Sequence, residues 1–214
     1  GLAGGGDVTL GGAGTALGAF SLQAARDVSV SHAINAGAAT GITAARNVAL
    51  ADVNTAGDLN VTASNGSAAA ANVTARGNLN VTAGQAIALS GQTVSGGNAT
   101  LASGGDMTLV GSIAAQQAGK LTAGGSIDAA SIAFGKQATV SAANSIAVKG
   151  SVATDGDLAM TAGNDLAIGS AQTGGAIDLR AQGHNGAGDV IVNGGLTSGK
   201  ATTIAAARDV VIAG

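Results

Sequence analysis

The fold of this chain is decided by the stretch Gly77-Asn78-Leu79-Asn80-Val81-Thr82-Ala83-Gly84-Gln85-Ala86-Ile87-Ala88-Leu89. It contains one short sequence pattern twice: a small or polar turn residue, then two apolar residues separated by one residue of any kind. Leu79 and Val81 form the first pair, and Ile87 and Leu89 form the second pair eight residues later. Alternation with a period of two is typical of a β-strand that buries one face. The stretch therefore predicts two short strands.

The second of these strands recurs along the whole chain of 214 residues. The step from copy to copy is 19 or 20 residues, with a single step of 24, and such a period indicates a repeat protein. We expect the inward residues that begin these strands to form a ladder that sets the rigidity of the molecule. They are Val8, Val28, Val48, Ser67, Ile87, Met107, Ile127, Ile146, Leu166, Val190 and Val210.

Each repeat carries two further strands. The strand before the ladder shows the same alternation, in Phe20/Leu22, Leu59/Val61, Leu79/Val81, Ala99/Leu101, Leu158/Met160 and Ile177/Leu179. A weaker apolar mark follows the ladder by five to seven residues, at Ile34, Val53, Val73, Val94, Ile113, Ile132, Val152 and Leu196. Three strands and three corners in about 20 residues suit one coil of a solenoid, and parallel connections of this kind are almost always right-handed. We expect an all-β fold, a right-handed parallel β-helix of about eleven coils.

The repeat runs through residues 1–214 as a single segment, and we interpret it as a window of a longer protein without capping coils at its ends. Two places depart from the regular pattern. Leu121 lies six residues before Ile127 where other pairs have eight, which predicts a shortened corner. The stretch 180–188 lengthens one coil by four residues and is expected to form a surface loop.

The composition excludes several classes of protein. The chain has 37 glycines, no proline and no cysteine, and its only aromatic residues are Phe20 and Phe134. A net charge of −3 without a basic cluster argues against nucleic-acid binding. No apolar run approaches ~18 residues, so we expect no transmembrane segment.

Polar residues directly precede the ladder strands and form a column of their own. The column could be a series of metal ligands or catalytic acids, but Asp, Asn and Ser also stabilise tight corners by bonding their own backbone, and we favour that structural role. We expect no metal site and no cofactor. The column is Asp7, Asp27, Asn47, Gly66, Ala86, Asp106, Ser126, Ser145, Asp165, Asp189 and Asp209.

The insertion supplies the best candidate for contact with a partner, because surface loops often carry binding groups. Its polar residues are Arg180, Gln182, His184 and Asn185. They suggest a site for a cell-surface receptor or a glycan; the alternative is a neutral glycine-rich bulge.

Some β-helices are enzymes that cut polysaccharides with paired acids in a cleft. Asp155 and Asp157 are the tightest acid pair here, and a turn explains them equally well. We therefore expect no enzymatic activity and no small-molecule substrate.

Four phrases resemble the repeats of filamentous haemagglutinin and the stalks of contact-dependent inhibition toxins. They are Ala25-Arg26-Asp27-Val28-Ser29-Val30, Ala45-Arg46-Asn47-Val48-Ala49-Leu50, Gly77-Asn78-Leu79-Asn80-Val81-Thr82-Ala83-Gly84 and Ala207-Arg208-Asp209-Val210-Val211-Ile212. The resemblance covers essentially the whole chain, apart from residues 180–188.

The resemblance implies a right-handed parallel β-helix in a large exoprotein that leaves the cell by two-partner secretion. Such proteins cross the outer membrane unfolded, through a β-barrel partner, and fold outside the cell. The family has no catalytic residues in its stalk to transfer to this sequence. The resemblance thus implies a secreted or cell-surface stalk that projects a distal module in adhesion or toxin delivery.

Overall fold

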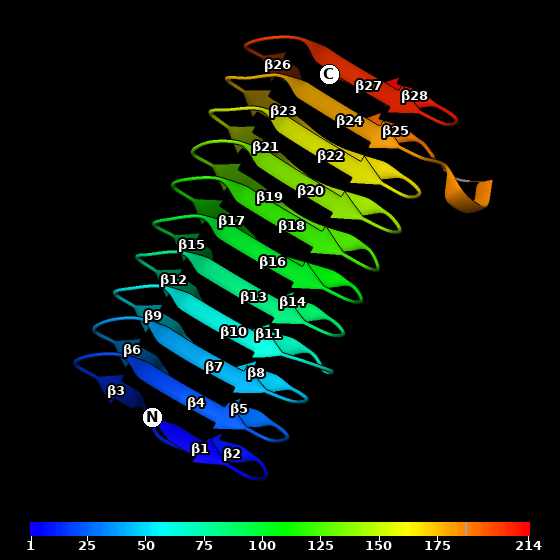
Figure 1. The fold of residues 1–214 in the computed structure, drawn as a ribbon. Coiled ribbons are helices and arrows are strands. Elements are labelled where there is room, and N and C mark those ends of the chain that lie inside the picture. The colour runs from blue at the N-terminus through cyan, green and yellow to red at the C-terminus, as the bar shows by residue number, and fades with distance from the viewer. Residues whose placement is uncertain (187) are drawn as a thin grey trace.

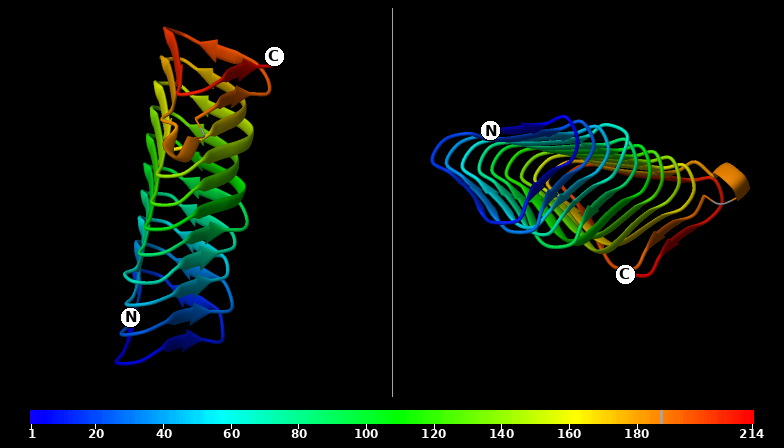
Figure 2. Two further views of the ribbon diagram at one scale, coloured as in Figure 1. Left: turned by 90° about the vertical axis from the view of Figure 1, so that its right-hand side faces the viewer. Right: turned by 90° about the horizontal axis from the view of Figure 1, so that it is seen from below.

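The computed structural model describes residues 1–186 and 188–214 and confirms the all-β fold. In Figure 1 the chain begins at the bottom, crosses the front sheet from left to right, returns behind it and rises by one coil. The solenoid is therefore right-handed. Figure 2 shows that its coils stack into a rod with a flattened cross-section. Across the described residues the chain completes ten turns, and the last two strands begin an eleventh coil.

One sheet contains the first strand of every coil. All of its pairings are parallel and join equivalent residues one coil apart, such as Leu59 with Leu79 and Val61 with Val81. Its strands are β1 (Leu2–Gly4), β4 (Phe20–Ala24), β7 (Thr40–Ala44), β10 (Leu59–Ala63), β13 (Leu79–Ala83), β16 (Ala99–Ser103), β18 (Gly119–Ala123), β20 (Ala138–Ala142), β22 (Leu158–Ala162), β24 (Ile177–Ala181) and β27 (Thr202–Ala206).

The second and third strands form the other faces of the rod. The separate second strands are β2 (Val8–Leu10), β5 (Val28–Val30), β8 (Val48–Leu50), β11 (Ala68–Ala70), β14 (Ile87–Leu89), β25 (Val190–Val192) and β28 (Val210–Ile212). The separate third strands are β3 (Gly14–Ala16), β6 (Ile34–Ala36), β9 (Val53–Thr55), β12 (Val73–Ala75), β15 (Thr93–Ser95) and β26 (Leu196–Ser198). In the coils between them the two strands are continuous and bent, as β17 (Met107–Ala115), β19 (Ile127–Phe134), β21 (Ile146–Thr154) and β23 (Leu166–Thr173).

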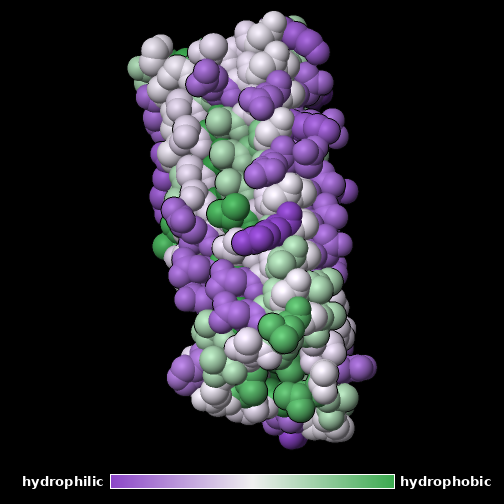
Figure 3. Space-filling view, turned by 90° about the vertical axis from the view of Figure 1, so that its left-hand side faces the viewer, coloured by the Kyte–Doolittle hydropathy of each residue, from purple (hydrophilic) through white to green (hydrophobic). Residues whose placement is uncertain are grey.

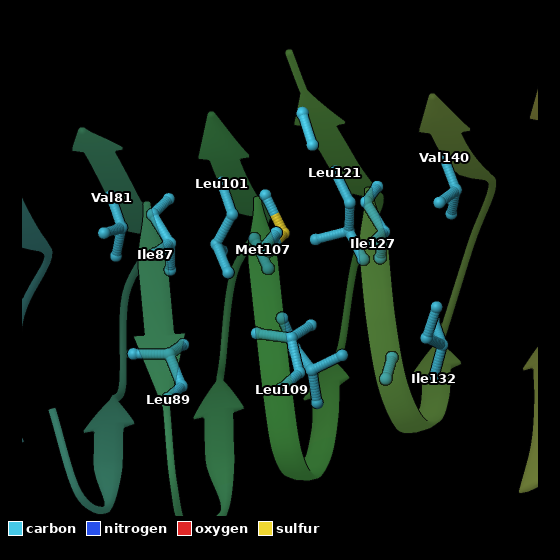
Figure 4. Packing of buried hydrophobic residues seen from close by; sticks show 14 of the residues in the cluster. Val81, Ile87, Leu89, Leu101, Met107, Leu109, Leu121, Ile127, Ile132 and Val140 are labelled. Carbon is cyan, nitrogen blue, oxygen red and sulfur yellow. The ribbon is translucent and has the colours of Figure 1, made fainter. Parts of the chain in front are cut away.

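Apolar side chains from the three faces fill the lumen and stack from coil to coil. The alternation predicted for Leu79 and Val81 is confirmed, since both are buried while Asn80 between them is exposed. The lumen is narrow, and the aliphatic side chains of Val, Leu, Ile and Ala fill it with the close packing that is typical of protein interiors. Figure 4 shows residues that face one another across it: Val81 with Ile87, Leu101 with Met107, and Leu121 with Ile127.

The fourth ladder position is Ala68, and our assignment of Ser67 was wrong. Ala68 is buried and pairs with Val48 below and Ile87 above, whereas Ser67 lies in the preceding corner. This corner, 64–67, has one residue more than the corner 45–47 of the coil below. The additional residue displaced the prediction by one position.

The third strand β15 also differs from the prediction. Thr93 and Ser95 point into the lumen, and Val94 points outward with 41% of its surface exposed. The lumen accepts Ser95 because its hydroxyl donates to the carbonyls of Gly77 (2.9 Å) and Asn98 (3.0 Å). The prediction took Val94, the most apolar residue of this strand, as inward, and therefore assigned the wrong face of β15 to the lumen.

The shortened corner predicted before Ile127 does not exist. Strand β18 begins at Gly119, which pairs with Ala99 and Ala138, so the spacing to Ile127 is eight residues as elsewhere. Gly119 has no side chain to mark this inward position in the sequence. The insertion is real, but it occupies 182–189, because Arg180 and Ala181 belong to β24.

Candidate functional site

The ladder residues lie at the inward start of the second strands, as predicted. Val28, Val48, Ile87, Met107, Ile127, Ile146, Leu166 and Val190 are buried. Val8 is only partly buried and Val210 is 49% exposed, because each lies in a terminal strand with a neighbouring coil on one side only.

The polar column before these strands ties each coil to the next. Oδ1 of Asp27 accepts the backbone amide of Asn47 (2.9 Å), and Oδ1 of Asn47 accepts that of Ser67 (3.0 Å). We expected such residues to bond within their own corner, but the bonds run to the equivalent residue one coil later. Ser67, not Gly66, is the member of the column in the fourth repeat, and its hydroxyl accepts the amide of Ala86 (3.3 Å).

Arginines reinforce this column at both ends of the rod. Arg46 contacts Asp27 at 2.5 Å, and Arg208 contacts Asp189. The amide of Asn47, together with the Arg46 guanidinium, holds the pKa of Asp27 below its ordinary value. The Arg208 guanidinium lowers the pKa of Asp189, and that carboxylate in turn raises the pKa of Arg208.

The corner between third and first strands has a ladder of the same kind. Oδ1 of Asp58 accepts the amide of Asn78 (2.7 Å), and Oδ1 of Asn78 accepts that of Asn98 (2.9 Å). Gly77 makes room for the first of these bonds, because a Cβ at this position would overlap Oδ1 of Asp58. Carboxylate and amide oxygens in these corners are occupied by backbone amides, which is a structural use of groups that could otherwise serve as ligands.

The insertion forms the one 3-10 helix among the described residues, η1 (His184–Gly186), which projects from the side of the rod in Figures 1 and 2. The base of the loop is fixed by the polar column. Oδ1 of Asp165 accepts the amides of Gly188 (2.8 Å) and Asp189 (3.0 Å). Glycine at 183, 186 and 188 adopts positive φ there, a conformation that other residues rarely take.

The four predicted contact residues do not form one cluster that the structure describes. Arg180 lies on the outer face of β24, where its Nε donates to Asp178 (2.9 Å). Gln182 and His184 are exposed in the loop, and the amide of His184 donates to the carbonyl of Gly163 (2.7 Å). The side chain of Asn185 lies outside the described part of the chain.

A shallow groove follows the outer side of the third strands, and our sequence analysis did not predict it. Its larger section, about 690 Å³, has a floor of small apolar side chains that includes Val94, Ala114, Ala133 and Ala153. A second section of about 500 Å³ lies nearer the N-terminus and is lined by polar residues such as Asn54. Figure 3, which shows the side of the rod that lies to the left in Figure 1, has several green patches separated by white and purple side chains. The sequence could have indicated this groove, because the outward residue of each third strand, such as Val94 or Ala114, is small and apolar in several successive coils.

The described residues contain no group of three or more His, Cys, Asp or Glu side chains placed to hold a metal ion. Of the acid pair, Asp157 belongs to a corner ladder, where its Oδ1 accepts the amide of Ala176 (2.8 Å). Asp155 is exposed at the edge of the groove. No helix in the part of the chain that the structure describes is long and apolar enough to cross a membrane.

Comparison with known proteins adds no identity to this description. No protein-family model, no curated protein and no solved structure matches the chain.

Proposed function

We propose that this chain is a rigid segment of an extracellular stalk, which holds a distal module away from the cell surface. The observation that carries the proposal is the parallel pairing that continues from coil to coil along the rod, with local register shifts at the bends between β17 and β19, β19 and β21, and β21 and β23. Backbone pairing, lumen packing and corner ladders all join equivalent residues of successive coils. The proposal includes no catalytic step.

Rigidity follows from this construction. To bend the rod, neighbouring coils must separate on one side, which breaks parallel strand pairing and lumen contacts together. The stability of such an array comes from interfaces between nearest neighbours, so each additional coil extends the rod without changing the interfaces already formed. A spacer needs these two properties.

The resemblance to filamentous haemagglutinin repeats and to contact-dependent inhibition stalks supports a place in a two-partner secretion exoprotein. The absence of cysteine fits passage through an outer-membrane β-barrel partner as an unfolded chain, because no disulfide has to form or open on the way. Coils that pair only with their neighbours can then fold in sequence outside the cell.

Deletion of one coil tests the spacer construction. Removing residues 59–78 joins Asp58 to Leu79 and places β13 on β7. The amide of Asn98 can then donate to Oδ1 of Asp58, which accepts the amide of Asn78 in the parent chain. The variant should fold and shorten by about 4.8 Å, the spacing of neighbouring strands. Because the chain has no cysteine, spin labels at Thr9→Cys and Val211→Cys report this change in length.

Deletion of residues 59–68 is the matched control. It removes half a coil and leaves about ten residues, in place of one full coil, between Val53 and Val73, which pair in the parent chain, so it should abolish cooperative unfolding. If both deletions behave alike, the modular spacer is wrong.

The stalk role itself is tested by display on a bacterial surface, with a reporter binding domain at the distal end. Removing coils should reduce binding to a target buried in a polymer brush, and should leave binding to the soluble target unchanged. Binding that is independent of the number of coils would contradict the proposal.

The projecting loop supports a second candidate, a module that binds a glycan or a cell-surface receptor. The loop can be replaced without damage to the core by exchanging 182–189 for Ala-Arg-Asp, the corner that follows β27 at 207–209. Saturable binding to a glycan panel that is lost in this variant, at an unchanged melting temperature, would support the module. If neither form binds, the binding module is wrong and the stalk remains the proposed function.

A further inference from the structure

Asparagine followed by glycine occurs where corners of this solenoid are longer than the corner below. Asn65-Gly66 lies in corner 64–67, against 45–47 one coil earlier. Asn193-Gly194 lies in corner 193–195, where Ile168 and Ala171, which pair with Val192 and Leu196, are separated by only two residues. A further Asn-Gly pair, 185–186, is in the inserted loop. Such corners suit both residues, because each tolerates tight turns.

The additional residue leaves Gly194 without a place in the hydrogen-bond ladder. The amide of Asn193 donates to the carbonyl of Ile168 (3.0 Å), and the carbonyl of Gly195 accepts from Ala171 (3.1 Å). Within the part of the chain that the structure describes, the Gly194 amide has no acceptor and the Asn193 side chain has no hydrogen-bond partner. Asn193 is exposed and Gly194 is half-buried.

We propose that Asn193 is a site of spontaneous covalent modification, in which it deamidates through a succinimide. The Gly194 nitrogen, losing its proton to solvent, attacks Cγ of Asn193; the new C–N bond closes a five-membered ring, the Cγ–Nδ2 bond breaks, and Nδ2 leaves as ammonia. Water then opens the ring at either carbonyl and yields aspartate or isoaspartate. The only co-reactant is water, and no atom changes its oxidation state.

The geometry favours this reaction at Asn193 for three reasons. The attacking amide need not give up a hydrogen bond, the side-chain amide is in solvent, and glycine at 194 places no Cβ beside the ring that forms. Asparagine is among the thermolabile residues of proteins, and its surroundings decide which copies react.

Asn65 provides a comparison inside the same chain. Gly66 is buried beneath the next coil, where its carbonyl accepts the amide of Gln85 (2.9 Å). The Asn65 side chain is held by a bond from Nδ2 to the carbonyl of Ala45 (3.2 Å). Ring closure here requires the coil to open first, so we expect the fold to protect Asn65.

The test is a time course of the folded chain at 37 °C and mildly alkaline pH, followed by trypsin digestion and tandem mass spectrometry. Peptide 181–200 reports Asn193, and peptide 47–76 reports Asn65. Fragment ions and an Asn185→Gln variant separate Asn193 from the asparagine of the loop. Synthetic peptides of the same sequences give the unrestrained rates, and methylation by an isoaspartyl methyltransferase detects isoaspartate.

Asn193 should gain about 1 Da, the mass change of amide to acid. Its rate should be within about tenfold of the free peptide, the factor that corresponds to restraining a single residue's backbone. Asn65 should react more slowly than its own peptide by a larger factor. Asn144, which is also exposed in a corner but precedes Ser145, should not react in peptide 137–149.

Two variants identify the reacting pair. Asn193→Gln should abolish the gain at this position, and Gly194→Ala should slow it, although the added Cβ would lie 2.9 Å from the carbonyl oxygen of Gly169. An unmodified Asn193 in the folded chain, over the time in which the free peptide converts, would overturn the proposal. Equal rates at Asn65 and Asn193 would also overturn it, because the fold would then play no part.

Discussion

The ring of Phe134 occupies the space that a side chain at Gly119 would fill. Phe134 is the last inward residue of β19, with Ala115 below it and Thr154 above it in the same column. An ideal Cβ on Gly119 would overlap three atoms of the ring. Gly119 does not have a positive φ, so it is required here for space and not for backbone conformation. The large volume of the buried Phe134 side chain is thus accommodated because Gly119, on the facing strand, has no side chain.

Gly119→Ala should therefore destabilise the protein by about 1–3 kcal/mol, the usual cost of overpacking a core. Phe134→Ala should cost about 3–5 kcal/mol, because it leaves a cavity. In the Phe134→Ala background, Gly119→Ala should lose its cost, giving a coupling of at least about 1 kcal/mol in a double-mutant cycle. Urea unfolding of the four proteins measures it. Additive effects would show that the two residues do not compete for space.

The same pair shows what the sequence could reveal about the fold. Period, strand alternation and parallel stacking were predictable because most inward positions carry Leu, Val or Ile. Gly119, Thr93 and Ser95 are inward without being apolar, so a search for apolar residues placed these positions incorrectly. The role of Gly119 depends on the ring of Phe134, and that of Ser95 on the carbonyls of Gly77 and Asn98 in two corners; a single sequence does not show which residues meet.

Thr93→Val should stabilise the protein. The Thr93 hydroxyl is buried, and the structure gives it no hydrogen-bond partner in the described part of the chain. Its column neighbours, Val73 and Ile113, are apolar. Removing an unsatisfied hydroxyl of the same shape should raise the free energy of unfolding by about 1 kcal/mol, measured as a shift in the urea midpoint.

Thr173→Val is the matched control for this substitution. Thr173 is equally buried, but its hydroxyl donates to the carbonyl of Gly175 (3.0 Å). The control should lower the free energy of unfolding by about 0.5–1.5 kcal/mol. The same sign for both variants would contradict the role of the hydrogen bond.

The coil that begins with β10 contains a small void. Ala68 and Ala70 take positions that hold larger residues in the next coil, Ile87 and Leu89, and a void of about 10 Å³ remains between them and Leu50, Leu59 and Leu89. Its lining is apolar, so it stays dry. Ala70→Val should stabilise the protein by up to ~0.8 kcal/mol for each carbon that fits. Ala83→Val in β13, a column of small residues, should destabilise it. Thermal unfolding compares them, and a lower melting temperature for Ala70→Val would show that the void is already closed.

The corner ladders were only half predictable. The sequence shows that Asp, Asn and Ser precede the second strands, and turn chemistry accounts for the residue types. It does not show that Oδ1 of Asp27 reaches the amide of Asn47, because the two residues become neighbours only when the coils stack. The groove over Val94 was missed for a different reason: its floor consists of the outward residues of the third strands, and the prediction took Val94 as an inward residue.

Asp27→Asn should change how stability depends on pH. The folded pKa of Asp27 lies below its ordinary value, so its ionisation contributes stability above the unfolded pKa of about 3.9. That contribution disappears as the pH falls through the folded pKa. An asparagine at position 27 keeps an oxygen that can accept the amide of Asn47, as Asn47 itself does for Ser67, but it lacks the negative charge that faces Arg46.

The melting temperature of the variant should therefore be lower than that of the parent chain at neutral pH, and the two should converge as the pH falls through the folded pKa of Asp27. Thermal unfolding followed by circular dichroism at several pH values measures the difference. A difference that is the same at every pH would show that bond geometry, and not ionisation, gives Asp27 its role.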